Sequence, residues 1–342
     1  MTSEASRAIV EDYLRFCDDS AVGILPYALA IAARMGIADL VHGGTTGLDD
    51  LARALRTDPD PLRRLLRALV SCELLEERPP GCFALTRLGD VLRSDSPRSQ
   101  RARLSNLDSY RAWLAAADAM EVGRPAFERT FSATFFGHKE ADPEAGRQFD
   151  RRMRERSTCL YVDVLARHDW RGSRRVMDVG GGTGTVLAAV LEAAPHLHGI
   201  LFDRRQVLER VRWHGPLGRV AARCACVAGD FFRALPAGAD THLMCSVLHD
   251  WDDERAAAIL RNSARALRPG GRLVLCELVV PDPPRWHPGT WSDLGMMVVL
   301  GGRERTRREF AGLLDAAGFE LVSAAESDDA AFSLLDARRR ET

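Results

Sequence analysis

One short stretch of this sequence, SVLHDWDDE, combines a histidine with four carboxylates directly behind an apolar run. His249 is followed there by Asp250, Asp252, Asp253 and Glu254. A histidine can act as a general base near neutral pH, and histidine together with carboxylates can bind a metal ion. The same acids can begin a helix, because negative charge stabilises a helix N-terminus. A base, a metal site and a helix cap are therefore the three interpretations to separate.

The spacing favours a helix start for the acids and does not favour a metal site. No second histidine stands at ligand spacing, and the residue order of a calcium loop with its turn glycine is missing. The acids instead precede the helical pattern DDERAAAILRNSARALRPGG, whose inward side is formed by Ile259, Leu260, Ser263 and Leu267. We therefore expect no metal, and His249 is left as the candidate base.

A glycine loop follows an apolar run in the second half of the chain. MDVGGGTGTVL predicts a strand, a turn and a helix start, with Gly180, Gly182 and Gly184 spaced as G-x-G-x-G behind Asp178. The dinucleotide pattern G-x-G-x-x-G fails, because its last position falls on Thr185. An acidic residue beside the loop suits a cationic amino-acid cofactor better than a pyrophosphate.

The next two strand ends carry partners for an adenosine group. Asp203 lies 25 residues after Asp178 and can accept hydrogen bonds from ribose hydroxyls. In AGDFF, after Gly229, Asp230 can accept from an adenine amino group and Phe231 can lie against the ring. Each residue alone is as readily a loop or cap residue, but three successive strand ends favour a nucleoside-containing cofactor.

The elements that would position these residues alternate as in a parallel sheet covered by helices. The apolar runs RRVMDVG, HGILFD, THLMCSVLHD and GRLVLCELVV alternate with helical stretches that start near Thr183, Gln206 and Asp252. TRREFAGLLDAAGFELVSAAES adds a helix and a strand, and AFSLLDARR adds a last strand. The predicted fold class is α/β, and we assign this domain to residues 171–342.

Residues 1–100 are predicted to be mainly helical with one late hairpin. The helix in AVGILPYALAIAARMGIADLV ends at Gly36, and two short helices follow that are joined at residues 58–61, with Asp60 as N-cap of the second. Two strands then flank a Pro-Pro-Gly turn. This order forms a winged helix, and its very apolar first helix fits burial between two subunits.

A winged helix also admits a DNA-binding interpretation, with Arg63, Arg64 and Arg67 as phosphate contacts. Against it, residues 1–100 carry about three more acids than arginines, and the whole chain has 47 basic and 48 acidic residues. We expect neither nucleic acid nor a membrane as partner. Eight scattered cysteines without a C-x-x-C pair, and the lack of a signal-peptide core or a long apolar run, predict a cytoplasmic protein with reduced thiols.

The second half resembles the class I S-adenosylmethionine-dependent methyltransferases. The whole chain resembles small-molecule O-methyltransferases with an N-terminal winged-helix dimerisation domain, of the plant caffeic acid type and its bacterial antibiotic-pathway relatives. The matching pieces are FDRRMRERS, DVGGGTG, LFD, GDFF, LHDWDDE, LRPGGRLVLCE, GGRERT and AAGF. The resemblance implies a Rossmann-like, mostly parallel sheet with an antiparallel last strand, a homodimer, and S-adenosylmethionine as cofactor with S-adenosylhomocysteine as product, without a metal.

The resemblance also implies the cofactor contacts, residue by residue. In FDRRMRERS, Phe149, Met153 and Ser157 match positions that pack on or bond the cofactor. Plant members have a lysine four residues before the histidine, where this chain has Cys245, so we expect main-chain groups or Ser246 to substitute. The full expected set is Phe149, Met153, Ser157, Asp178, Gly180, Gly182, Asp203, Gly229, Asp230, Phe231, Cys245 and Ser246.

Methyl transfer to a hydroxyl is an in-line displacement in which the oxyanion is the far stronger nucleophile. With pKa values of about 10 for a phenol and about 6.5 for histidine, full deprotonation is uphill by roughly 5 kcal/mol, and proton removal concurrent with attack reduces that cost. The imidazolium then needs an acceptor on its other nitrogen. The resemblance matches Glu277 in LCELVVP and Glu304 in GGRERT to this role, and Glu277 also interrupts an apolar strand, where a carboxylate needs a partner.

Residues 101–170 are predicted to be a helical connection that contributes to the substrate pocket. Their aromatic-rich part, GRPAFERTFSATFFGHKEADPEAG, can line a pocket for a flat ligand or be ordinary core. The family resemblance implies an acceptor pocket lined by this region and by residues between the acids, which gives the substrate-binding candidates Trp113, Met120, Phe136, Asp250, Asp293, Met296 and Met297.

The predicted function is transfer of a methyl group from S-adenosylmethionine to a phenolic hydroxyl of a small, antibiotic-like aromatic compound, with His249 as general base. Two alternatives stay open: a family relative that binds the cofactor but acts as hydroxylase or decarboxylase, and a ligand-sensing DNA-binding regulator. Relatives of the former kind lack the histidine, which weighs against that alternative. The motifs specify neither the acceptor nor which hydroxyl is methylated.

Overall fold

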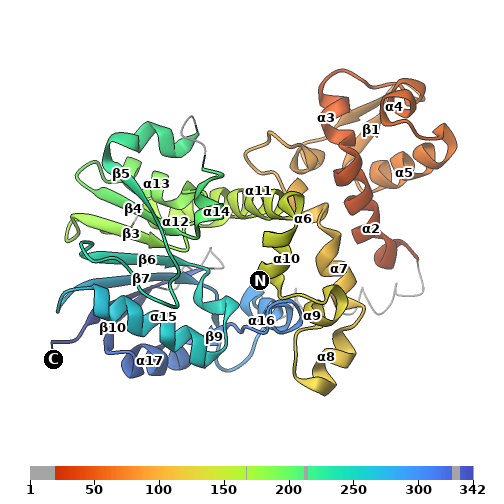
Figure 1. Ribbon diagram of the computed structural model, residues 1–342. Coiled ribbons are helices and arrows are strands. Elements are labelled where there is room, and N and C mark those ends of the chain that lie inside the picture. Colours follow the sequence, from red (N-terminus) through yellow and green to blue (C-terminus); the bar gives the residue numbers. More distant parts are fainter. Residues whose placement is uncertain (1–19, 167, 212–214, 326–331, 342) are drawn as a thin grey trace. The chain divides into compact units, whose positions relative to one another are not determined.

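The computed structural model describes residues 20–166, 168–211, 215–325 and 332–341, which are drawn in colour in Figure 1. The chain divides into two compact units, Met1–Tyr110 with Arg147–Arg156, and Arg111–Gly146 with Ser157–Thr342. Each unit has hydrophobic core of its own, so each is described by itself. The N-terminal stretch that lacks a signal-peptide pattern, residues 1–14, lies outside the described residues.

The first unit has the predicted order of helix, helix pair and hairpin. α2 (Ser20–Met35) ends at Gly36, whose φ of 70° is a conformation that favours glycine. The hairpin pairs Leu75 with Leu85 across the Pro-Pro-Gly turn, which confirms that prediction. The other elements are α3 (Ile37–His42), α4 (Leu48–Leu55), α5 (Pro59–Ser71), β1 (Leu75–Glu77), β2 (Phe83–Leu85), η1 (Gly89–Leu92) and α6 (Arg101–Leu104).

The N-cap of α5 is Asp58, so the prediction of Asp60 was wrong. The Asp58 carboxylate accepts a hydrogen bond from the Asp60 main-chain N–H at 2.8 Å, and Pro59 occupies the first turn. Proline suits that position, because its φ is helical and its missing N–H would have no intrahelical acceptor. Either Asp-Pro step in DPDP meets this requirement, and the helix begins at the earlier one.

The second unit contains a seven-stranded sheet in the order β10-β11-β7-β6-β3-β4-β5. The parallel strands are β3 (Arg175–Val179), β4 (His198–Asp203), β5 (Cys224–Ala228), β6 (Thr241–Cys245) and β7 (Arg272–Glu277). β11 (Ser333–Arg339) is antiparallel to β7 and to β10 (Phe319–Ala325). The predicted α/β fold class, with a mostly parallel sheet and an antiparallel last strand, is confirmed.

Helices cover both faces of this sheet (Figure 1), because the central strands are apolar on both sides. One face packs on α15 (Asp253–Ala266) and α17 (Arg307–Ala316), and the predicted inward residues Ile259, Leu260, Ser263 and Leu267 are all buried. The opposite face packs on α12 (Val162–Ala166), α13 (Thr185–Ala193) and η2 (Pro216–Arg223). The strands and helices that alternate along the sequence therefore form one sheet with a layer of helices on each face.

The remaining elements lie in residues 107–160 or in the connections between the strands of the second unit. Within residues 111–146, Phe127 is buried and its ring centroid lies 4.3 Å from that of Phe131, so part of the aromatic interlude is core. These elements are α7 (Leu107–Trp113), α8 (Ala116–Val122), α9 (Ala126–Phe131), α10 (Phe135–Ala141), α11 (Pro143–Leu160), α14 (Arg205–Leu208), η3 (Leu248–Asp250), β8 (Val279–Val280), α16 (Pro288–Val299) and β9 (Arg305–Thr306).

His242, on β6, makes folding stability depend on pH. It is fully buried beside the Ser263 hydroxyl, 2.8 Å from Nδ1, and burial lowers its pKa to about 4. The unfolded chain takes up a proton there below about pH 6.5, whereas the folded chain does so only near pH 4, so stability present above pH 6.5 is lost as the pH falls between these values. We expect a loss of about 3 kcal/mol from this residue, measured by urea unfolding across that range.

The variant His242→Asn, which does not titrate, isolates this contribution. Its free energy of unfolding is expected to fall less than that of the wild type over the same pH range. Parallel curves for the two proteins would contradict the prediction.

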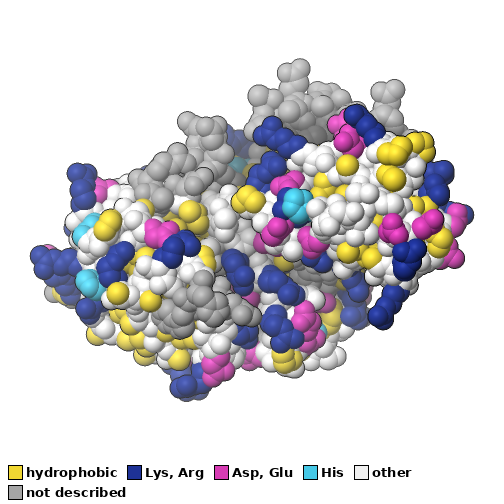
Figure 2. All heavy atoms as spheres, turned by 90° about the horizontal axis from the view of Figure 1, so that it is seen from above, with side chains coloured by type: hydrophobic (Ala, Val, Ile, Leu, Met, Phe, Trp, Pro, Cys, Tyr) yellow, Lys and Arg dark blue, Asp and Glu magenta, His cyan; other side chains and the backbone are white. Residues whose placement is uncertain are grey.

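Charged side chains of both signs share the face drawn in Figure 2, where arginines stand among aspartates and glutamates. The described side chains on that face form no broad basic area of the kind that nucleic-acid binding requires. None of the described helices combines the length and the hydropathy that a membrane span requires.

Candidate active site

The carboxyl ends of β3, β4 and β6 meet at one edge of the sheet, where open α/β folds bind ligands. The loop after β3 turns through Gly180, Gly182 and Gly184, whose φ values are 72°, 60° and 82°. A Cβ on Gly180 would also lie 3.1 Å from the Val247 side chain. The loop therefore needs glycine both for its conformation and for its close approach to the turn after β6.

Two acids at neighbouring strand ends are held by main-chain groups. Asp203, after β4, accepts from the N–H of Gly182 at 2.8 Å and from the N–H of Arg204 at 2.7 Å. Asp230, after β5, accepts from the Phe232 N–H at 2.9 Å and its side chain is half-exposed. Asp203 thus ties its strand end to the glycine loop, and Asp230 keeps a carboxylate oxygen near the surface.

Phe231 and Gly229 shape the same edge. The Phe231 ring makes edge contacts with Phe232 and Trp251, and its carbonyl accepts from the Asn262 side chain at 2.8 Å. A Cβ on Gly229 would lie 2.5 Å from the Phe202 ring, so only glycine fits without displacing that ring. An aromatic face is thereby fixed beside Asp230.

Asp178 lies beneath the glycine loop. It is 1% exposed, and a Cβ on Gly181 would lie 2.5 Å from its Oδ2. Burial, and then the negative charge of Asp203, raise its pKa to about 7. Among the described residues no donor reaches Oδ2. A cationic group bound at this loop would favour the ionised carboxylate, which fits the cationic cofactor that the sequence implies.

Cys245 and Ser246 end β6, directly before the histidine turn. Cys245 lies opposite Cys276 on β7, and burial raises the pKa of its thiol well above the usual value, so it is uncharged at neutral pH. It therefore replaces a lysine without replacing the charge. Ser246 adopts a φ of 50°, and its hydroxyl lies 2.7 Å from the hydroxyl of Tyr161.

His249 occupies the short turn η3 between β6 and α15 and is 3% exposed. Its Nδ1 lies 2.8 Å from Glu304 Oε1 and 4.0 Å from Glu277 Oε2, and its Nε2 lies 3.3 Å from Asp250 Oδ1. The structure thus brings together the histidine and both carboxylates that the sequence analysis paired with it, although they are far apart in the chain.

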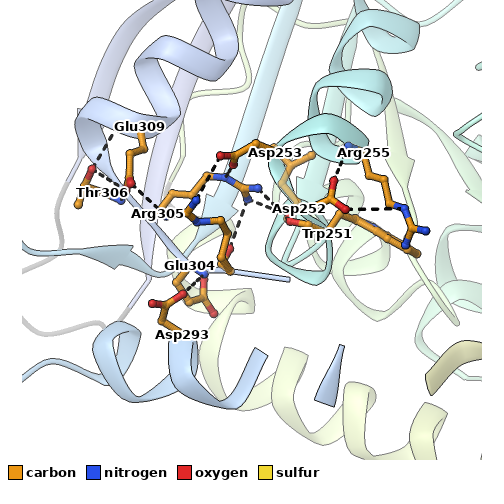
Figure 3. A network of polar contacts seen from close by, with 11 residues as sticks. Trp251, Asp252, Asp253, Arg255, Asp293, Glu304, Arg305, Thr306 and Glu309 are labelled. Carbon is orange, nitrogen blue, oxygen red and sulfur yellow. Dashed lines mark hydrogen bonds and ion pairs between the residues drawn. The ribbon is translucent and has the colours of Figure 1, made fainter. Parts of the chain in front are cut away.

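Each carboxylate is held by a different element. Glu277 ends β7, and its Oε1 accepts from the main-chain N–H groups of Val247 and Leu248 at 3.1 and 2.9 Å. Glu304 precedes β9, and its Oε1 accepts from the Ser292 hydroxyl at 2.7 Å. Its N–H donates to Asp293 Oδ1 at 2.9 Å, a contact drawn in Figure 3. Glu277 therefore binds the turn itself, and α16 holds Glu304 against the ring.

The pKa of His249 is raised to about 9 in this cluster. Burial lowers it, but the carboxylates of Glu304, Asp250 and Glu277 favour the imidazolium more strongly. Burial raises the pKa of Glu277 to about 7, with His249 opposing that shift and Glu304 adding to it. The carboxylates therefore favour the imidazolium, so the ordinary histidine pKa used with the sequence understates the basicity of His249.

The predicted substrate-binding residues lie on several elements. Phe136 on α10 stacks on Trp251 with ring centroids 5.5 Å apart, and the guanidinium of Arg204 lies 5.4 Å from its ring. Met296 and Met297 are half-buried on α16. Trp113 and Met120 are 42% and 56% exposed in the single chain.

The predicted cofactor residues of α11 divide between the two units. Phe149 and Met153 belong to the stretch Arg147–Arg156 of the first unit, whereas Ser157 belongs to the second. Phe149 and Met153 are partly buried within the described chain.

Comparison with known proteins gives an independent assignment. The O-methyltransferase domain matches residues 113–320, and the O-methyltransferase dimerisation domain matches residues 21–95. The chain belongs to this O-methyltransferase family. The resemblance inferred from the motifs is therefore confirmed, and with it S-adenosylmethionine as the methyl donor of the family.

Similar proteins of this family include enzymes of antibiotic pathways. Phenazine O-methyltransferase PhzM of Lysobacter antibioticus is 37% identical over 296 residues, which cover 86% of this chain and 87% of that protein. Aclacinomycin 10-hydroxylase RdmB of Streptomyces purpurascens is 36% identical over 310 residues, covering 88% and 82%. The crystal structure of NcsB1, an O-methyltransferase from neocarzinostatin biosynthesis, with S-adenosylmethionine and 2-hydroxy-5-methyl naphthoic acid matches with a TM-score of 0.79 and 31% identity, covering 92% and 95%.

The cluster of His249, Glu277 and Glu304 also has a second interpretation. One ligand atom from each residue lies within 4.8 Å of the others, which is also the spacing of a cation site. Glu304 Oε1 already contacts Nδ1 of His249 and accepts a hydrogen bond from the Ser292 hydroxyl. Glu277 Oε1 already accepts hydrogen bonds from two main-chain N–H groups. These contacts fit a base with two carboxylate partners, whereas Glu277 Oε2, which has no hydrogen-bond partner among the described residues, fits a cation site equally well.

Three residues that lie next to His249 were not predicted from the sequence. Ser292 binds the same Glu304 oxygen as the imidazole, Arg305 is buried against the turn, and a Cβ on Gly302 would lie 2.1 Å from the His249 carbonyl oxygen. The motif GGRERT contains two of them, but an arginine among arginines in sequence usually indicates a solvated charge. Ser292 gives no sequence signal at all.

Proposed function

We propose that this protein transfers a methyl group from S-adenosylmethionine to a phenolic hydroxyl of a small aromatic compound, with His249 as general base. The observation that carries the proposal is the 2.8 Å contact between His249 Nδ1 and Glu304 Oε1. Such a contact directs the Nδ1 proton to the carboxylate, so that Nε2 exchanges a proton with the acceptor. Phenazine and hydroxynaphthoic acid, named with two similar proteins, are aromatic and support this class of acceptor.

S-adenosylmethionine supplies a methyl group on a positively charged sulfonium. We propose that the chain holds it at the edge of the sheet, with Asp203 on the ribose and with Asp230 and Phe231 on the adenine. Asp178, buried beneath the glycine loop, stabilises the positive charge of the amino-acid part. The other proposed cofactor contacts are Phe149, Met153, Ser157, Gly180, Gly182, Gly229, Cys245 and Ser246.

Proton removal costs less in this site than with an ordinary histidine. A base with a pKa of about 9 lies about one unit below a phenol, which corresponds to about 1.4 kcal/mol instead of roughly 5. The carboxylates on the far side of the ring stabilise the imidazolium that forms. A base with a raised pKa is mostly protonated at pH 7, so a rise of pH should raise turnover.

We expect kcat/KM for the acceptor to rise with pH toward about 9 in the wild type, because only unprotonated His249 accepts the proton. Glu304→Gln removes the carboxylate charge that raises the pKa of His249 but keeps a hydrogen-bond acceptor. The rise of kcat/KM with pH should therefore occur at lower pH in this variant. The pH profile of kcat/KM at saturating S-adenosylmethionine checks the shift, with Glu320→Gln, an exposed position on β10, as control. A pH profile that is unchanged in Glu304→Gln would show that another group sets it.

The proposed activity is tested by incubating the protein with S-adenosylmethionine and a panel of phenols. S-adenosylhomocysteine should form with at least one phenol, and mass spectrometry should show one added methyl group on the product oxygen. Aromatic amines and aliphatic alcohols are the control acceptors. A protein that binds S-adenosylmethionine but forms no S-adenosylhomocysteine with any phenol would contradict the proposal.

The second candidate is hydroxylation, because a 36% identical relative is named as a hydroxylase. The contacts of His249 favour methyl transfer, because a general base paired with two carboxylates has no evident role in hydroxylation. A product that gains one oxygen atom without consumption of the methyl group would support the hydroxylase.

We also propose a homodimer formed through the first unit. The side chains of Ile24, Tyr27 and Ile31 on α2 are 56%, 51% and 47% exposed in the single chain and share one side of the helix. Ile31→Glu is therefore expected to yield monomers in light scattering after size exclusion. Arg67→Glu, exposed on α5, should leave the mass unchanged, and dimeric Ile31→Glu would contradict this interface.

A further inference from the structure

Three consecutive residues, Arg303, Glu304 and Arg305, run alongside the turn that carries His249. The N–H of Arg303 donates to the His249 carbonyl at 2.9 Å, and Glu304 Oε1 meets the imidazole Nδ1 at 2.8 Å. The first contact fixes the main chain of the base and the second fixes its ring. The third residue of the segment has no part in the chemistry proposed above.

Arg305 is the largest fully buried side chain among the described residues, at 1% exposure. Its Nη1 donates to the carbonyl of Leu248 at 3.0 Å and its Nη2 to the carbonyl of Trp251 at 2.9 Å. Its Nε donates to Asp253 Oδ1 at 2.9 Å, in the first turn of α15. Figure 3 shows the Arg305 side chain with its contacts to Asp253 and Trp251. Burial of a cation is costly, so contacts on all three nitrogens are what permit it here.

The two carbonyls bound by Arg305 bracket the base, since Leu248 precedes His249 and Trp251 follows Asp250. We propose that Arg305 is a positioning residue, whose guanidinium holds this turn so that the His249 ring stays in contact with Glu304. The proposal rests on the proposed function of His249 as base. A planar fork of donors can bind two separate carbonyls and a carboxylate at once, whereas a lysine ammonium offers no such fixed geometry.

A merely structural role makes a different prediction. If Arg305 only supported α15, its replacement would lower the melting temperature and leave the properties of His249 in the folded protein unchanged. If it positions the base, release of the two carbonyls lets the turn move relative to Glu304. The Nδ1 contact then weakens, kcat falls, and the pKa of His249 moves down toward the usual histidine value.

The experiment compares Arg305→Lys and Arg305→Met with the wild type, using S-adenosylmethionine and a phenol that the wild type methylates. We expect kcat, compared on the plateau of its pH profile above the pKa of His249, to fall about 10- to 100-fold, while KM for the phenol and Kd for S-adenosylmethionine change less than about threefold. NMR titration of the histidine ring should show the lowered pKa of His249. Arg308→Met, an arginine of the following helix with a side chain 88% exposed, is the matched control and should match the wild type.

A folded Arg305→Met protein with kcat within about twofold of wild type would overturn the proposal, as would a lower kcat with an unchanged His249 titration. If Arg305→Met does not fold, Arg305→Lys and Asp253→Asn, which removes the anchor of Nε, decide by the same two measurements. His249→Ala is measured in parallel. Turnover retained in His249→Ala refutes the base itself, whereas turnover lost there but kept in the Arg305 variants refutes only the positioning role.

Discussion

His249→Ala is expected to lower kcat roughly 10²- to 10⁴-fold while S-adenosylmethionine binding survives. The reason is chemical: without the imidazole the acceptor hydroxyl must lose its proton to water, and a neutral phenol is a poor nucleophile. Binding should survive because none of the proposed cofactor contacts lies on η3, and because main-chain groups hold Asp203 and Asp230 at the ends of β4 and β5. Steady-state kinetics and calorimetric titration with S-adenosylmethionine measure the two effects separately.

The variant also distinguishes a base from a residue that only shapes the pocket. With an acidic phenol that is already ionised at the assay pH, the deficit of His249→Ala should shrink, because no proton has to be removed. A deficit of equal size for ionised and neutral phenols would contradict the base assignment, as would unchanged turnover. His198→Ala, exposed on β4, is the control for loss of a histidine elsewhere.

The fold was predictable because its determinants are local. Apolar runs that end in glycine or an acid, alternating with helical patterns, specify parallel strands covered on both faces, and the antiparallel last strand followed from the family resemblance. The error at α5 shows the limit of such patterns. Asp58 and Asp60 each precede a proline, so either could cap the helix, and the sequence alone does not decide between two equivalent starts.

The residues of the site were predictable from sequence patterns only where a polar side chain lies within or directly after an apolar run. Glu277 interrupts an apolar strand, where a carboxylate needs a buried partner, and His249 follows another apolar run, in the turn after β6. Glu304 came from the resemblance, since its closeness to the ring depends on how α16 and β9 pack. Ser292 and Arg305 act through tertiary contacts with main-chain or carboxylate oxygens, and no periodicity or spacing encodes such contacts.

Nor does the sequence reveal the basicity of His249. Four acids follow His249 closely in the chain, but two of them have other contacts. Asp252 caps α15 by accepting from the N–H of Arg255, and Asp253 forms an ion pair with Arg305. The carboxylates that raise the pKa of His249 are chiefly Glu304 and Asp250. Of the neighbouring acids, Asp250 therefore has the largest effect on the electrostatics of the ring.

Gly302→Ala should be nearly as damaging as loss of the base, although it adds a single methyl group. A Cβ at Gly302 would lie 2.1 Å from the His249 carbonyl oxygen and 2.4 Å from the Asp250 carbonyl carbon. Both are main-chain atoms, so no rotamer change relieves the overlap, and the segment of residues 301–305 must move away from η3. Because Glu304 moves with it, we expect kcat to fall roughly 100-fold and the melting temperature to drop.

Gly312→Ala supplies the opposite case with the same substitution. Its Cβ would meet nothing within 4 Å on α17, so it should keep full activity and gain about 0.5–1 kcal/mol of stability from the better helix propensity of alanine. Kinetics and thermal melting of both variants measure the contrast. Wild-type kcat in Gly302→Ala would mean that the 301–305 segment can separate from the turn without cost, and that the contact of Glu304 with His249 does not set the rate. A loss confined to kcat, with S-adenosylmethionine affinity retained, would locate the damage at the base, because the glycine loop after β3 does not depend on this contact.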